Sequence, residues 1–150
     1  MDEIEPAVST SVKGPLGICH LPRLWLKILL HACGRLPEGY RHGIGGFDES
    51  LCQKFGIDRD AFIAYIENEK PDYQSLERWV EKNARDLTPR NVAEWNQRVT
   101  THNMGDEMAA ERRGRFGLAD PQFANAIALN DLDDWAGLHK RLTAAVPAAS

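Results

Sequence analysis

The sequence has no long hydrophobic run. Its most apolar stretch, residues 21–30, is interrupted by Arg23 and Lys27 and is about half the length that a membrane-spanning helix needs. The opening, MDEIEPAVSTSVKG, is acidic at its start and lacks the basic and apolar regions of a secretory signal. These absences predict a cytoplasmic protein with no membrane partner.

The sequence also has no excess of positive charge and no regular cysteine pattern. Its 18 Lys and Arg face 22 Asp and Glu, a net charge of −4, which argues against a nucleic-acid partner because such proteins need a basic face. Cys19, Cys33 and Cys52 are too few and too widely spaced for a disulfide framework or a structural zinc site. We expect reduced, partly buried thiols.

The sequence motifs of common cofactor sites and hydrolases are missing as well. The glycines of GIGGF, residues 43–47, lack the flanking strand and helix of a dinucleotide site, and there is no phosphate-binding Gly-x-x-x-x-Gly-Lys-Ser/Thr run. There is no Gly-x-Ser-x-Gly elbow and no His-Glu-x-x-His pair. We therefore expect no organic cofactor, which leaves proton transfer, with or without a divalent metal.

Helix signals are present along almost the whole sequence. Pro22 suits the first turn of a helix that ends near Gly34. Residues of the N-cap type precede the later helices: Asp48, Asp58, Asp72 and Thr88. No segment has a convincing strand pattern, so the sequence predicts an all-α fold.

The length and composition favour one compact domain. The chain has 150 residues, of which 43% are hydrophobic, enough to bury a single core. We predict a helical bundle of six or seven short helices over residues 1–150, with a core of about 15–143. The ends, residues 1–14 and 144–150, are expected to be flexible.

A long glycine-rich loop is predicted after the first helix. Residues 34–47 contain five glycines and a proline, too many for a regular element. Tyr40 and His42 alternate within it, and the glycines at 43, 45 and 46 let the backbone bring either side chain over the first helix. The loop is therefore a candidate lid, or else only an ordered connection.

Polar residues recur through the apolar first helix. Arg23, Lys27 and His31 are four residues apart, so their side chains follow one side of the helix. Arg23 can hold a carboxylate or phenolate, Lys27 can stabilise negative charge, and His31 can carry a proton near neutral pH. The alternative is a polar stripe that faces water.

Several motifs together resemble a known family. LPRLWLK, GYRHG, KFGID and NDLDDW are similar to those of small bacterial proteins known only as a domain of unknown function, the 5069 family, over most of residues 14–136. The resemblance implies a compact, mostly helical cytoplasmic fold. The positions that correspond to the family's pattern are Arg23, Lys27, Tyr40, His42 and Asp48.

The sequence departs from that pattern at Leu26 and Leu29, which are apolar where the family is more polar. An exposed apolar helix face is unfavourable, so we expect a second subunit, a ligand cavity or the protein's own core to cover this helix. The four tryptophans, by contrast, have helical spacing typical of core residues: Trp25, Trp79, Trp95 and Trp135.

These observations predict a small-molecule site on the first helix and the loop. The candidate catalytic residues are His31, His42, Tyr40 and Lys27. The candidate substrate-binding residues are Arg23, Trp25, Leu26, Leu29 and Phe47. A divalent metal is the weaker alternative, and its candidate ligands are His20, His31, His42 and Asp48.

The expected function is that of a cofactor-independent lyase on a small aromatic or largely apolar substrate. Retro-aldol release of an aldehyde, decarboxylation or elimination needs only a positioned base and a stabiliser for the anion that forms. The alternative is a non-catalytic interaction module, in which Leu26, Leu29 and Leu30 dock a partner or a second copy of the chain.

Overall fold

The protein is almost entirely helical. The computed structural model describes residues 2–144, which form seven helices: α1 (Leu21–Ala32), α2 (Gly46–Phe55), α3 (Arg59–Glu69), α4 (Tyr73–Asn83), α5 (Pro89–Thr101), α6 (Asp106–Phe116) and α7 (Ala126–Ala144). Within these residues the only β-pairing is one isolated bridge between Asn103 and Asn125. The predicted all-α fold is confirmed. None of the described helices is long and apolar enough to cross a membrane.

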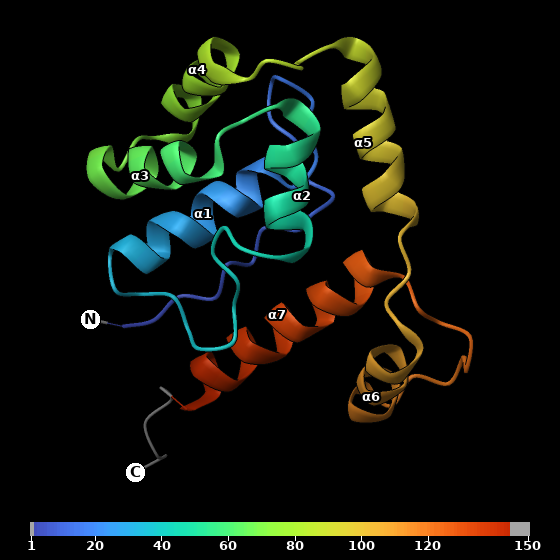
Figure 1. Ribbon diagram of the computed structural model, residues 1–150. Helices are drawn as coiled ribbons and strands as arrows, with labels where there is room; N and C mark the ends of the chain where they lie inside the picture. Colours follow the sequence, from blue (N-terminus) through green and yellow to red (C-terminus); the bar gives the residue numbers. More distant parts are fainter. Residues whose placement is uncertain (1, 145–150) are drawn as a thin grey trace.

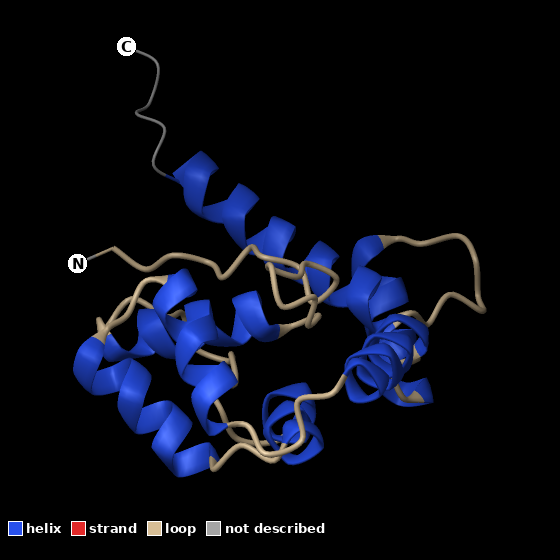
Figure 2. Ribbon diagram, turned by 90° about the horizontal axis from the view of Figure 1, so that it is seen from above, coloured by secondary structure: helices blue, strands red, loops and turns tan. Residues whose placement is uncertain are grey.

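Helix α1 lies at the centre of the arrangement. Figure 1 shows α3 and α4 on one side of α1, α7 passing on the other, and α5 beside α2. Figure 1 shows α6 at the lower right of the molecule, and α6 contacts α7. The view from above in Figure 2 shows helices and loops along the described residues. The loop between α1 and α2, residues 33–45, crosses between α1 and α7 (Figure 1).

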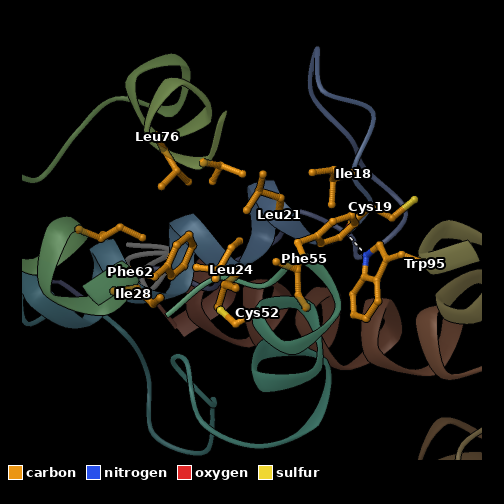
Figure 3. Packing of buried hydrophobic residues seen from close by; sticks show 14 of the residues in the cluster. Ile18, Cys19, Leu21, Leu24, Ile28, Cys52, Phe55, Phe62, Leu76 and Trp95 are labelled. Atoms are coloured by element: carbon orange, nitrogen blue, oxygen red, sulfur yellow. Dashed lines mark hydrogen bonds between the residues drawn. The ribbon is translucent and has the colours of Figure 1, made fainter. Parts of the chain in front are cut away.

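One side of α1 forms the centre of the hydrophobic core. Leu21, Leu24 and Ile28 are completely buried and pack in one cluster with aromatic and aliphatic residues of α2 to α5, as Figure 3 shows. The Trp95 indole N–H donates a 2.8 Å hydrogen bond to the Cys19 carbonyl. Because this face of α1 is apolar, Arg23 and Lys27 lie on a different side of the helix.

Three of the four predicted helix caps are confirmed. Asp58, Asp72 and Thr88 each accept a hydrogen bond from the backbone N–H three residues later. The prediction for Asp48 is wrong, because α2 already begins at Gly46, with Gly45 as its N-cap. Asp48 lies inside the first turn, and its carboxylate contacts α1 instead.

The N-terminal segment is held more firmly than expected. Residues 2–14 contain no helix, but Glu5 and Thr10 are buried. Arg23 Nη1 donates to the carbonyls of Pro6 and Val8. These hydrogen bonds hold the N-terminal segment against α1. Of the predicted flexible C-terminal segment, Ala144 ends α7 and residues 145–150 lie outside the described part of the chain.

Three of the four tryptophans lie in or against the core, as their helical spacing predicts. Trp95 is fully buried, and Trp25 and Trp79 pack against the core. Trp135, however, is 55% exposed. Helical spacing showed that it lies on one face of α7 but not which face the rest of the protein covers.

Candidate functional site

An open cleft of about 890 Å³ lies between two groups of elements. Residues of α1, the glycine-rich loop and the start of α2 line one side, and residues from the end of α5 through α6 and α7 line the other. Its size is typical of a small-molecule site. The lining includes five candidate residues that the sequence predicts: Arg23, Lys27, Tyr40, Phe47 and Asp48.

A buried ion pair forms part of the cleft wall. Lys27 Nζ lies 2.8 and 2.9 Å from the two carboxylate oxygens of Asp48, and both residues are at least 95% buried. His20 Nε2 lies 2.7 Å from Asp48 Oδ1, and the Gly43 N–H donates to Oδ2 at 3.0 Å. Asp48 therefore accepts four hydrogen bonds, about as many as a carboxylate can.

The conformation and surroundings of Gly43 explain why this loop position is a glycine. Gly43 is buried with φ of +113°, and a Cβ there would lie 2.6 Å from the Ile63 side chain. Only glycine brings the backbone this close to α3 in such a conformation, and this placement directs the Gly43 N–H at Asp48. The loop thus helps to hold the ion pair.

The hydrogen bonds determine the protonation of the Lys27–Asp48–His20 cluster. Burial disfavours charge on Asp48, but the His20 hydrogen bond and the Lys27 charge outweigh it and lower the pKa from 3.8 to about 2. Burial lowers the pKa of His20 and of Lys27, although Asp48 opposes both shifts. An ionised carboxylate only accepts, so a neutral His20 donates from Nε2 and accepts from the Thr10 hydroxyl at Nδ1, 3.0 Å away.

A second buried ion pair joins α1 to α7. The Arg23 guanidinium donates to both oxygens of Asp134, at 2.7 and 3.2 Å, and the Tyr40 hydroxyl donates to Asp134 Oδ1 at 2.9 Å. Burial and the Asp134 charge raise the pKa of Tyr40, so it stays protonated. Arg23 and Tyr40 thus fix the geometry around the cleft, and neither is a base.

The low pKa of Asp48 predicts a loss of stability in acid. Above about pH 4 the carboxylate is ionised in both states, whereas between pH 4 and pH 2 the unfolded chain binds the proton first. The free energy of unfolding is expected to fall by about 2 kcal/mol through this group as the pH drops across that interval. Urea unfolding at several pH values measures it, and an equally steep fall in the Asp48→Asn variant would contradict the assignment.

An aromatic and sulfur-containing surface adjoins the buried ion pairs. The Phe47 ring makes edge contacts with His20, Trp95 and His102, with centroids 5.8, 6.0 and 5.2 Å apart. Met104 and Met108 also line the cleft. Such a surface suits an aromatic or apolar ligand body.

His102 is a cleft residue that the sequence did not single out. It is exposed, follows the last residue of α5 and lines the cleft. Its sequence neighbours, Thr101 and Asn103, form no recognisable motif with it. Only the packing against Phe47, 55 positions earlier, reveals its place.

The remaining predicted site residues lie outside the cleft. His31 is exposed, and its ring stacks on that of His42 with centroids 3.7 Å apart, but neither residue lines the cleft. The same holds for Trp25, Leu26 and Leu29. Trp25 and Leu29 instead pack partly buried against the core, so the third explanation for the apolar first helix, a better-filled core, accounts for Leu29.

The proposed metal ligands are split between two places. His20 and Asp48 contact one another at the ion pair, whereas His31 and His42 form the separate stacked pair. Among residues 2–144 there is no group of three or more His, Cys, Asp or Glu side chains that could hold a metal ion.

The fold and the site define an all-α protein with a small-molecule-sized cleft and buried ion pairs in its wall. The chain belongs to the family described as "Domain of unknown function (DUF5069)", which it matches over residues 9–135. This range contains all the candidate residues named above. A comparison with curated proteins gives no match.

Proposed function

We propose that the cleft binds a small molecule with an aromatic or apolar body and an anionic or phenolic group. The observation that carries this proposal is that Asp48 leaves one N–H donor of the Lys27 ammonium group without a partner among residues 2–144. This group has three N–H donors, of which Asp48 takes two, and Lys27 lines the cleft. The third donor is the natural partner of a ligand oxygen, while Phe47 and the methionines would contact the apolar body.

We further propose that the protein cleaves this molecule as a cofactor-independent lyase. In a retro-aldol step a base takes the proton of a substrate hydroxyl that is β to a carbonyl group, the bond between the α and β carbons breaks and an aldehyde leaves. The electron pair of that bond passes to the remaining fragment as an enolate-type anion, which Lys27 would stabilise. The base then returns its proton to this fragment, so no other reactant is needed.

The base in this proposal is His102. Imidazole is the most frequent general base in enzymes, and both His102 and Lys27 line the cleft. Asp48 and Tyr40 are unsuitable, because the first already accepts four hydrogen bonds and the second stays protonated. His31 and His42, the bases predicted from the sequence, do not line the cleft.

The proposal places this activity in the cytoplasm. Cys19, Cys33 and Cys52 are free thiols in the structure, and thiols persist in a reducing compartment.

The test is a panel of β-hydroxy ketones whose aromatic ring carries a carboxylate or a phenol, with the released aldehyde trapped by a hydrazine. Wild-type protein is expected to release aldehyde from at least one compound, and His102→Gln about a hundredfold more slowly. His31→Gln is the matched control and should retain the wild-type rate. Failure of every compound to bind or react, or full activity in His102→Gln, would overturn the proposal.

One observation favours the alternative of a non-catalytic interaction module. Trp135 and Leu142, both on α7, are 55% and 68% exposed, which makes them better docking residues than Leu30, whose side chain the core buries. A homodimer that Trp135→Glu dissociates, together with an inactive cleft, would support this second function.

A further inference from the structure

The charge of this protein is unevenly distributed. The whole chain has a net charge of −4, yet the cleft lining contains seven Lys and Arg side chains and only five Asp and Glu. An acidic protein thus has a local excess of positive charge at one concave surface. Such an arrangement raises the local concentration of anions.

The acidic side chains of the lining are largely occupied. Four of the five carboxylates form ion pairs, and their partners are as follows: Asp48 with Lys27, Asp134 with Arg23, Asp133 with Arg115 and Glu5 with Arg141. Three cations of the lining form no ion pair with any carboxylate in residues 2–144: Arg41, Arg98 and Lys140. They come from the loop, α5 and α7, so they approach the cleft from different sides.

Arg112 of α6 adds an incompletely paired guanidinium. Its Nη1 is out of contact with water and has no hydrogen-bond partner. The nearest oxygen of Asp133 is 3.7 Å from Nη1, beyond hydrogen-bond distance, and Arg115 already binds Asp133 at 2.7 Å. A buried N–H without an acceptor is unfavourable, so a small shift of this side chain toward a ligand oxygen would be favourable.

We infer that the ligand of this cleft is phosphorylated. This inference rests on the proposed function: Lys27 binds the first anionic or phenolic group, and the cations around the cleft, with Arg98 and Arg112 foremost, bind a phosphate group. Guanidinium forks match phosphate oxygens in pairs, and a phosphate dianion can engage more than one of them. A ligand with a single negative charge, bound by Lys27 alone, would leave Arg98, Arg112 and the other cleft cations without an anionic partner in the ligand.

The test compares two ligands that differ only in the phosphate. Calorimetric titration of the wild type with 4-hydroxybenzoate and with 4-carboxyphenyl phosphate is expected to show at least tenfold tighter binding of the phosphate ester. In Arg98→Gln and Arg112→Gln this advantage disappears, while the affinity for 4-hydroxybenzoate stays unchanged. Arg90→Gln is the control on α5, because Arg90 pairs with Glu94 and does not line the cleft.

The outcomes separate this inference from the proposed function. Equal affinity for the two ligands overturns the phosphate site but leaves the small-molecule cleft in place. A phosphate advantage that survives both substitutions also overturns it, because other residues must then bind the phosphate. Binding of neither ligand contradicts the proposed function itself.

Discussion

Replacement of Asp48 by asparagine is expected to lower the free energy of unfolding by about 3 to 5 kcal/mol. The side chain keeps its shape but loses its charge, which leaves the Lys27 ammonium buried beside a neutral amide. His20 loses an ionic hydrogen-bond partner at the same time. Urea unfolding followed by circular dichroism at pH 7 measures the change.

The neighbouring residue supplies the control for this experiment. Glu49 lies on the same helix and forms an ion pair with Arg59 that is about one-third exposed on both sides. Exposed pairs of this kind contribute less than about 1 kcal/mol, so Glu49→Gln should be almost neutral. A similarly small effect of Asp48→Asn would mean that the ion pair is not a buried structural feature.

The substitution Lys27→Met is expected to weaken binding of 4-hydroxybenzoate by about 2 to 5 kcal/mol. Methionine approximates the length of the lysine stem but has no ammonium group to donate to the ligand. Asp48 still accepts from His20 and the Gly43 N–H, which helps to retain the fold. Calorimetric titration, with circular dichroism to confirm folding, gives the result.

Another position on α1 tests whether this effect is specific. His31 lies one turn beyond Lys27, is exposed and stacks on His42 outside the cleft lining. His31→Gln should bind 4-hydroxybenzoate with wild-type affinity. Equal losses in both variants would point to a general disturbance of α1, and unchanged binding in Lys27→Met would remove Lys27 from the site.

Local features of this protein could be predicted from its sequence. The caps Asp58, Asp72 and Thr88 act within three residues of their own position, so the sequence around each contains the necessary information. The helical spacing of α1 likewise separates its apolar side from Arg23 and Lys27. The same spacing could not tell that these two are buried while His31 is exposed.

The contacts in the site between residues far apart in the sequence could not be predicted from local sequence patterns. The ion-pair partner of Arg23 is Asp134, 111 positions later, and no pattern in the sequence connects them. The sequence predicts a cap at Asp48 because its position before an apolar segment fits one, and Lys27, 21 positions earlier, gives no contrary signal. His102 enters the cleft only because α5 ends beside Phe47.

A crystal structure of the protein with 4-hydroxybenzoate tests the central claim most directly. We expect the ligand in the cleft, with its carboxylate or phenolic oxygen within hydrogen-bond distance of Lys27 Nζ and its ring against Phe47. Ligand density only elsewhere, for example in the shallow groove lined by Leu16, Leu87 and Val92, would contradict the claim that the buried ion pairs serve a binding site.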